Sequence, residues 1–281
     1  RMNLVVLAGD VDSVALKNVA KLTETREIEQ ITTRSFQLLG AKPHEALVAT
    51  CAEGGLDHVW LPEGRQLSDF GLFVTDMDST LINIECIDEI ADMQGLKREV
   101  AAITEAAMQG EIDFRESLTR RVGLLAGLPE SALAEVFDHR LQLNPGAERL
   151  LQGLQRAGIR TMLVSGGFTY FTERLKTRLG FDYAYANELE IIDGKLTGQV
   201  LGEIVDGEAK AANLERVRDE LGLKPEQVIA AGDGANDIPM LRAAGFGVAF
   251  HAKPVLRDVA HCCLDHTGLD GILDIFGPGT E

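Results

Sequence analysis

The chain has 281 residues, of which 45% are hydrophobic and 25% charged, proportions that are typical of a globular protein and exclude a disordered or coiled-coil chain. Its 27 basic and 44 acidic side chains give a formal net charge of −17, which disfavours nucleic acid and anionic membranes as partners. No apolar run approaches the roughly 18 residues of a membrane span. The apolar run at residues 3–8 is also too short for a secretory signal. We therefore expect a cytoplasmic protein.

The first 70 residues predict a small α+β domain with a linker at its end. Residues 3–8 are typical of a strand, and the helix that follows is expected to begin at Asp12 or Ser13. One long strand over 27–39, a helix over 43–53 and a third strand over 59–61 complete a βαβαβ pattern. This pattern resembles a shortened ACT-like module, a type that binds amino acids or mediates dimerisation. Regulation by serine and a purely structural or assembly role both stay open.

Residues 71–281 predict a catalytic domain. A strand over 71–75 precedes four amphipathic helices, which are expected over residues 85–93, 97–109, 114–125 and 131–139. From residue 146 onward helices and strands alternate, with helices over 146–157, 168–179, 208–221 and 236–244, strands over 159–164, 228–231 and 247–250, and a hairpin over 184–201 that turns at Asp193-Gly194. Alternation of this kind predicts an α/β fold with a doubly wound parallel sheet. The sheet core is then 71–83 and 143–281, and residues 84–142 are a helical cap inserted into it.

Polar clusters follow three of the predicted strands directly. They are Asp76-Met77-Asp78-Ser79-Thr80, Ser165-Gly166-Gly167 and Gly232-Asp233-Gly234-Ala235-Asn236-Asp237. Ligands of open α/β sheets bind beyond the carboxyl ends of the strands, so we expect these clusters to form one site rather than three unrelated turns. Four carboxylates at one edge require a hard cation, and Mg²⁺ prefers such oxygen ligands together with a substrate phosphate. Amides and a hydroxyl at a strand-to-helix junction suit a phosphate group, and the clusters together predict phosphoryl chemistry.

Several stretches of the sequence resemble motifs of the haloacid dehalogenase superfamily. They are DMDSTL (76–81), IECIDEIA (84–91), EAAMQGEIDFRESLTRRV (105–122), SGGF (165–168), DGKLTGQV (193–200) and GDGANDIPM (232–240). The chain from Gly71 to about Leu273 is similar to the branch of that superfamily that hydrolyses O-phospho-L-serine. The resemblance implies a Rossmann-like core with a cap and Mg²⁺ as cofactor. It also implies hydrolysis of O-phospho-L-serine to L-serine and phosphate, the last step of serine biosynthesis, through an aspartyl-phosphate.

The same resemblance implies the roles of the acidic residues. Asp76 would be the nucleophile that attacks phosphorus. Asp78 would protonate the leaving alkoxide and then deprotonate the attacking water. Asp76, the main-chain carbonyl of Asp78 and Asp233 would hold Mg²⁺, with Asp237 supporting them. Taken without the resemblance, Asp237 could equally cap the helix that follows it.

The resemblance also assigns the phosphate side of the site. Ser165, Gly166, Lys210 and Asn236 would bind the phosphoryl group. Lys210 lies in a helical stretch, however, and a helix lysine is usually solvated. Thr80 is expected to orient its loop rather than to react.

Substrate choice is expected to come from the cap. By resemblance, Glu85 would bind the substrate ammonium and Arg121 its carboxylate, for which a guanidinium is well suited. Arg120 lies beside Arg121, and because successive helix residues point about 100° apart only one of them can face inward. Met108 and Phe114 are either apolar lining of the site or ordinary cap core. The acidic residues Asp88, Glu89 and Asp92 are expected on a solvated helix face.

Two other functions stay open. One is hydrolysis or transfer of phosphate from another small phosphate monoester, which substrates lacking the amino or the carboxylate group would distinguish. The other is a receiver-like module that holds a phosphoryl group and signals. The second aspartate, Asp78, and the inserted cap favour an enzyme. The sequence leaves open whether the chain forms a homodimer.

Overall fold

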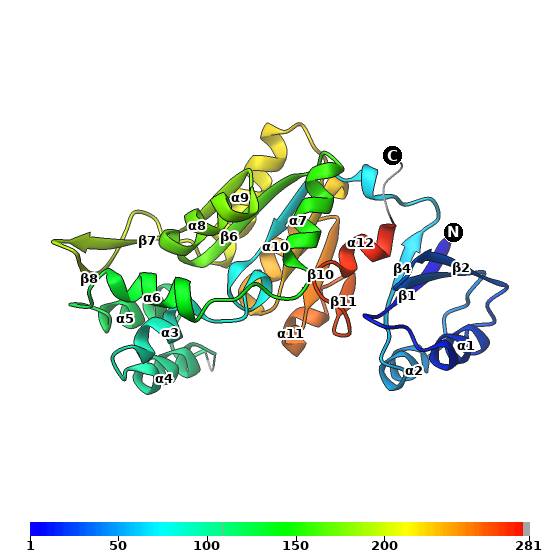
Figure 1. Cartoon of the computed structure of the whole chain (residues 1–281), viewed down its shortest axis with the longest axis horizontal. Coiled ribbons are helices and arrows are strands. Elements are labelled where there is room, and N and C mark those ends of the chain that lie inside the picture. Colours follow the sequence, from blue (N-terminus) through cyan, green and yellow to red (C-terminus); the bar gives the residue numbers. More distant parts are fainter. Residues whose placement is uncertain (109, 278–281) are drawn as a thin grey trace.

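The computed structural model describes residues 1–108 and 110–277. The side chain of Met108 and the whole of Gln109 lie outside the described part, so the expectation for Met108 stays a prediction. Two sheets organise the chain, one of four strands and one of seven. The four-stranded unit and the helical cap lie at opposite ends of the larger sheet (Figure 1). Among the described residues, no helix is long and apolar enough to cross a membrane.

The N-terminal unit is a βαββαβ arrangement rather than the predicted βαβαβ. Its elements are β1 (Met2–Leu7), α1 (Ser13–Leu22), β2 (Glu27–Thr32), β3 (Ser35–Leu39), α2 (Leu47–Glu53) and β4 (Asp57–Pro62). The strands lie in the order β2-β3-β1-β4, and all neighbours are antiparallel. The prediction of one strand over 27–39 was wrong because the chain reverses after Thr32. The Thr32 hydroxyl accepts from the Arg34 amide at 3.1 Å and lies 2.9 Å from the Ser35 hydroxyl, so the turn needs no Gly, Asn or Pro.

Both faces of the N-terminal sheet are covered. One face packs against α1 and α2, with Leu4, Val6 and Leu38 fully buried between them. The other face contributes to the core of the larger sheet with Val5, Leu7, Val59 and Leu61. Alternate residues of a strand point to opposite faces, which is how β1 serves both cores.

A polar junction also joins the two sheets. The buried carboxylate of Asp57 at the start of β4 accepts from the backbone amides of Asp265 at 3.0 Å and His266 at 2.9 Å. Arg34 donates to Asp270 at 3.0 Å. Buried acceptors with such partners are satisfied and add directional contacts to the apolar face.

The larger sheet confirms the doubly wound α/β prediction. Its strands are β5 (Leu72–Thr75), β6 (Arg160–Phe168), β7 (Tyr183–Ile192), β8 (Lys195–Leu201), β9 (Val228–Gly232), β10 (Phe246–Phe250) and β11 (Cys262–Leu264). Their order is β11-β10-β9-β5-β6-β7-β8, and all pairs are parallel except the β7–β8 hairpin. That hairpin turns at Asp193 and Gly194, where φ is 53° and 75°, as the Asp-Gly pair predicts.

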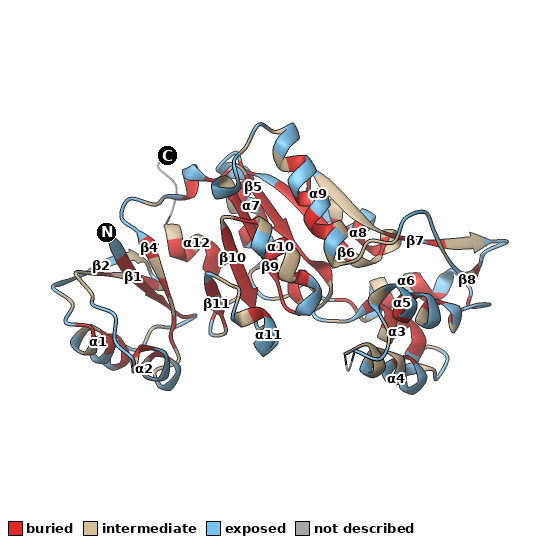
Figure 2. Cartoon of the chain, turned by 180° about the vertical axis from the view of Figure 1, so that it is seen from behind, coloured by how far each residue is buried: buried red, intermediate tan, exposed pale blue. Residues whose placement is uncertain are grey.

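Helices cover both faces of this sheet, as Figure 2 shows by the buried strands between them. They are α7 (Ala147–Arg156), α8 (Thr169–Leu179), α9 (Gly207–Glu220), α10 (Ile238–Ala243), α11 (Pro254–Arg257) and α12 (Gly271–Phe276), and short 3-10 turns lie at Leu67–Asp69, Pro225–Gln227 and Ala235–Asp237. Helices α7, α8 and α12 share one apolar cluster, whereas α9, α10 and α11 share the other. The elements after residue 251 were not predicted.

The cap consists of four helices at the predicted positions. They are α3 (Cys86–Asp92), α4 (Lys97–Met108), α5 (Phe114–Gly123) and α6 (Ser131–His139). The two chain connections to the cap lie side by side, because Ile82 and Leu143 form an antiparallel bridge. The β7–β8 hairpin extends toward the cap (Figure 1) and bridges it through Pro129 and Lys195.

Candidate active site

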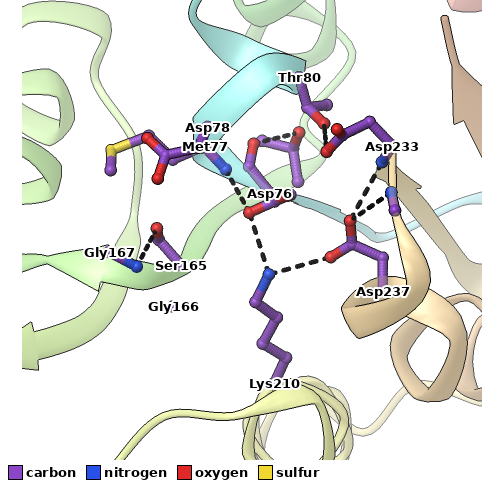
Figure 3. A network of polar contacts seen from close by, with 12 residues as sticks. Asp76, Met77, Asp78, Thr80, Ser165, Gly166, Gly167, Lys210, Asp233 and Asp237 are labelled. Carbon is purple, nitrogen blue, oxygen red and sulfur yellow. Dashed lines mark hydrogen bonds and ion pairs between the residues drawn. The ribbon is translucent and has the colours of Figure 1, made fainter. Parts of the chain in front are cut away.

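The three polar clusters meet at one edge of the larger sheet. Strands β9, β5 and β6 are adjacent. Asp233 and Asp76 directly follow β9 and β5, and Ser165 lies in the last part of β6, where its pairing with β7 is interrupted. Figure 3 shows their side chains converging, with Lys210 reaching them from α9. The predicted convergence of the clusters is thus observed in the fold.

The loop after β5 is held in one shape. Ser79 adopts a left-handed conformation with φ 58°, which turns the chain sharply. The buried Thr80 hydroxyl donates to Asp233 Oδ1 at 3.0 Å, as expected for a residue that orients its loop. Asn144, which sequence analysis missed, donates from Nδ2 to the carbonyls of Thr80 at 2.8 Å and Ile82 at 3.0 Å. Asn144 belongs to the second cap connection, so this connection and the loop after β5 are joined directly.

Lys210 lies between two carboxylates. Its side chain is 0% exposed, and Nζ lies 3.0 Å from Asp76 Oδ1 and 3.0 Å from Asp237 Oδ1. Burial by itself lowers the pKa of Lys210, but the charges of Asp237 and Asp76 outweigh burial and raise the pKa above its usual value. Lys210 is therefore a charged member of the site and not the solvated helix lysine that was the alternative.

Asp76, Asp233 and Asp237 form a cluster that could hold a metal ion. Each offers a carboxylate oxygen, and these oxygens lie within 4.8 Å of one another. Burial raises the pKa of Asp76 to about 6 and that of Asp237 to about 7. The charge of Lys210 opposes both pKa shifts. Because one ammonium group cannot balance three carboxylates, the donor set fits a hard divalent cation. Asp237 occupies the N-cap position of helix α10, but its side chain makes no capping hydrogen bond to that helix. Its Oδ2 instead accepts from the amide of Asp233 at 3.0 Å.

Asp78 differs from its neighbours in its surroundings. Desolvation raises its pKa well above the usual value, and the charges of Glu85 and Asp76 add to this shift. The carboxylate accepts one backbone hydrogen bond, from the Cys86 amide at 3.3 Å. A carboxyl group with a raised pKa holds a proton that it can donate, which suits a general acid.

The Ser165-Gly166-Gly167 segment approaches Asp78 closely. Ser165 is buried, and its hydroxyl oxygen accepts from the Gly167 amide at 2.8 Å. A Cβ on Gly167 would lie 3.0 Å from Ser165 Oγ and 3.3 Å from Asp78 Oδ2. A side chain at this position would therefore crowd Ser165 and Asp78, because the backbone itself borders the site.

The cap contributes an inward arginine. Arg121 is half-buried and lies near the charges of Asp88, Glu85 and Asp78, which oppose the lowering of its pKa by burial. Arg120 is exposed and donates to Glu116 at 2.7 Å. The prediction that only one of the two faces inward is confirmed.

The acidic residues of α3 are less solvated than expected. Asp88 is half-buried near Arg121, and Glu89 and Asp92 accept from Arg140 at 2.8 and 2.7 Å. Glu85 accepts from the Ser79 hydroxyl at 2.7 Å, which ties the cap residue to the loop of Asp78. The solvated-face expectation was therefore wrong for Asp88 and Glu89, which are both half-buried, whereas Asp92 is exposed.

The cap touches the core at the other side of the site. Phe114 lies over Gly166, where an added Cβ would be 3.1 Å from Phe114 Cζ. The next residue, Arg115, donates from Nε to Asp206 at 3.3 Å. Cap and core are therefore in contact on the side of the site where the Ser165-Gly166-Gly167 segment lies.

Two residues border the end of β9. Asn236 is exposed, and its carbonyl would lie 2.7 Å from a Cβ on Gly207, so the loop packs against the start of α9. Lys253, which sequence analysis missed, places Nζ 3.6 Å from Asp233 Oδ2. It follows β10, so the strand-end argument applied to that strand would have found it.

Comparisons with known proteins agree with this geometry. A family model described as haloacid dehalogenase-like hydrolase matches residues 73–242, and one described as a domain of unknown function (DUF4072) matches residues 4–47. The chain is 54% identical over 215 residues to a phosphoserine phosphatase of Polaromonas sp. (strain JS666 / ATCC BAA-500), an alignment that covers 75% of this chain and 91% of that protein.

Solved structures are similar as well. A probable phosphoserine phosphatase from Vibrio cholerae, in unliganded form, matches with a TM-score of 0.86 at 37% identity, over 98% of this chain and 86% of that one. A substrate-bound phosphoserine phosphatase complex matches with a TM-score of 0.69 at 41% identity, over 74% of this chain and 98% of that one. The match to the Vibrio cholerae structure includes the N-terminal unit, whereas the substrate-bound structure covers about three quarters of this chain.

Proposed function

This chain belongs to the haloacid dehalogenase-like hydrolases and, among them, to the phosphoserine phosphatases, and on that premise we propose that its acidic site hydrolyses O-phospho-L-serine with Mg²⁺ as cofactor. One observation carries the proposal. The buried Asp76 is paired with Lys210 at 3.0 Å, lies in a three-carboxylate cluster and is followed two residues later by Asp78, whose pKa is raised. An ionised nucleophile and a proton donor on one loop are what a two-step phosphatase needs.

In the first step Asp76 attacks phosphorus and forms an aspartyl-phosphate. Lys210 and the Met77 amide, 3.0 and 2.8 Å from Asp76 Oδ1, hold the carboxylate in one orientation. Asp78 donates its proton to the serine oxygen as the phosphorus–oxygen bond breaks, because an alkoxide is a poor leaving group. In the second step the ionised Asp78 takes a proton from water, which hydrolyses the aspartyl-phosphate and restores Asp76.

The phosphoryl group is held from two sides. Ser165, Gly166 and Lys210 donate to its oxygens, and Asn236 borders the same space. Asp76, the Asp78 carbonyl and Asp233 would hold Mg²⁺, with Asp237 behind them. When bound, the ion offsets the charge of these carboxylates and polarises the phosphoryl group.

Specificity comes from the cap. Arg121 offers a guanidinium for the substrate carboxylate, and Glu85 offers a carboxylate for its ammonium. Among the residues that the structure describes, Arg121 makes one hydrogen bond, from Nε to the Ser117 carbonyl at 3.3 Å, so its terminal nitrogens are available to an anion. The domain division at residue 70, the cytoplasmic location and the homodimer stay predictions.

Phosphate release from four compounds tests the proposal. With Mg²⁺ present, O-phospho-L-serine is expected to exceed phosphoethanolamine, a 2-phosphoglycerate-type acid and an aryl phosphate at least about 100-fold in kcat/KM, because each of the others leaves Arg121, Glu85 or both without a substrate partner. A chelator is expected to abolish turnover. Comparable turnover of all four compounds would contradict the specificity assignment, and no turnover of any would contradict the enzymatic one.

The arginine pair provides a matched test of substrate recognition. Arg121→Met is expected to lower kcat/KM for O-phospho-L-serine about 10- to 100-fold, the value of a hydrogen bond between charged groups. Turnover of phosphoethanolamine, which has no carboxylate, should be unchanged. Arg120→Met, one residue away and solvent-facing, should leave both substrates unaffected. Equal losses with both substrates in Arg121→Met would show that Arg121 supports the cap and does not bind the carboxylate.

A further inference from the structure

Strand β7 contains a buried asparagine to which no role has been given so far. The side chain of Asn187 is 1% exposed and all its polar atoms are bonded. Nδ2 donates to the Gly166 carbonyl at 2.9 Å and to the Val205 carbonyl at 3.4 Å, while Oδ1 accepts from the Val205 amide at 2.7 Å. One side chain therefore connects β7 with two segments that are far apart in the sequence.

The first connection compensates for an irregularity in β6. This strand pairs with β7 up to Val164 and again at Phe168, whose partner is Asn187, and the register shifts between these pairs. The intervening residues 165–167 leave the ladder, so their backbone groups need other partners. Asn187 supplies one to the Gly166 carbonyl.

This bond also sets the direction of the amide that holds the Ser165 hydroxyl. The Gly166 carbonyl and the Gly167 N–H belong to one planar trans peptide and point to opposite sides. With the carbonyl held by Asn187, the Gly167 N–H points toward Ser165 Oγ, 2.8 Å away. Two successive glycines impose little steric resistance to rotation of this peptide, so a side-chain hydrogen bond is what keeps it in place.

The second connection reaches the helix of Lys210. Val205 precedes Asp206, the N-cap of α9, whose side chain accepts from the Ala209 amide at 2.9 Å. Lys210 lies in the first turns of this helix. Asn187 therefore holds the start of α9 and the phosphate loop at a common point.

We propose that Asn187 is a positioning residue that, through the Gly166–Gly167 peptide, aligns the Ser165 hydroxyl with Lys210 so that both donate to the same phosphate group. The inference rests on the proposed function for the identity of its ligand. It assigns Asn187 no contact with the substrate. Its effect is transmitted through the Gly166 carbonyl and the Val205 backbone.

Binding of two products separates positioning from general structure. We would titrate inorganic phosphate and L-serine by calorimetry at fixed Mg²⁺ into the full chain and its Asn187→Ala variant. Phosphate affinity is expected to fall about 10- to 100-fold, since a misplaced Ser165 hydroxyl loses a hydrogen bond to a charged group. L-Serine affinity, which depends on the cap, should be unchanged. Asn213→Ala, which removes an asparagine of α9 that accepts from Arg216 at 2.9 Å, should change neither.

A second variant keeps the test decisive if Asn187→Ala does not fold. Asn187→Leu has nearly the same size, but its apolar side chain can neither donate to the Gly166 carbonyl nor accept from the Val205 amide. It should lose phosphate affinity as Asn187→Ala does. Unchanged phosphate affinity in a folded variant, or parallel loss of phosphate and L-serine, would overturn the proposal. If L-serine fails to bind the unmodified chain, the proposed substrate is wrong, while the phosphate titrations still decide the role of Asn187.

Discussion

Replacement of Asp78 by asparagine is expected to lower steady-state hydrolysis of O-phospho-L-serine about 10²- to 10⁴-fold, the usual contribution of a positioned acid and base. Asparagine has almost the same shape but neither donates a proton to the alkoxide nor accepts one from water. The raised pKa of Asp78 indicates that this carboxyl can carry the proton needed in the first step. Phosphate release under saturating substrate measures the loss.

An aryl phosphate separates the two duties of Asp78. Its leaving group departs as an anion without being protonated, so Asp76 in the Asp78→Asn variant should still be phosphorylated. Because the second step lacks its base, the aspartyl-phosphate should accumulate. We expect a rapid burst of aryl alcohol, stoichiometric with enzyme, followed by slow turnover, whereas O-phospho-L-serine should give no burst.

The control is an exposed aspartate of the cap. Asp138→Asn makes the same chemical change on α6 and should leave turnover and burst unchanged. If Asp78→Asn gives no burst with an aryl phosphate, Asp78 acts before phosphorylation in some way other than proton transfer, such as orientation of the loop that carries Asp76.

Replacement of Lys210 by methionine is expected to affect both stability and turnover. Methionine preserves most of the side-chain volume but leaves Asp76 and Asp237 as buried carboxylates without their shared cation. Removing one partner of a buried ion pair costs about 3–5 kcal/mol. Loss of a donor to the phosphoryl group should in addition lower turnover about 10²- to 10³-fold.

Denaturant unfolding and phosphate release measure the two effects. Lys17→Met, on the solvent-facing side of α1, is the matched control and should change neither. A Lys210→Met variant with normal stability would show that the two carboxylates are already neutral or solvated, and would contradict the buried pair at 3.0 Å. Normal turnover of the Lys210→Met variant would show that Lys210 does not bind the phosphoryl group.

Local sequence predicted most elements because their physical causes are local. The four cap helices follow from apolar residues three and four apart, and the β7–β8 hairpin follows from Asp193-Gly194, which adopt positive φ. The hairpin between β2 and β3 was missed because hydroxyls of Thr32 and Ser35 close it without a typical turn residue. The four-stranded topology therefore differed from the βαβαβ pattern.

Some residues of the candidate site could likewise be predicted from local sequence, whereas others could not. Asp76, Asp78 and Asp233 could be predicted because they come directly after strands, and Ser165 because it lies near the end of one. Parallel strands bring their carboxyl ends to one edge. The resemblance to a known superfamily was needed for Lys210, since a helix lysine by itself indicates a solvated surface. Only the structure shows that it is 0% exposed between two carboxylates.

What the sequence by itself determined is thus the α/β class, the inserted cap and the strand ends that carry the chemistry, because periodicity and turn residues act over a few positions. What only the tertiary structure decided is which side chains from distant segments meet. Asn144 joins the second cap connection to the loop after Asp76, and Asn187 joins the Ser165-Gly166-Gly167 segment to the helix of Lys210. These contacts depend on strand order and register, which long-range packing sets and which no local pattern encodes.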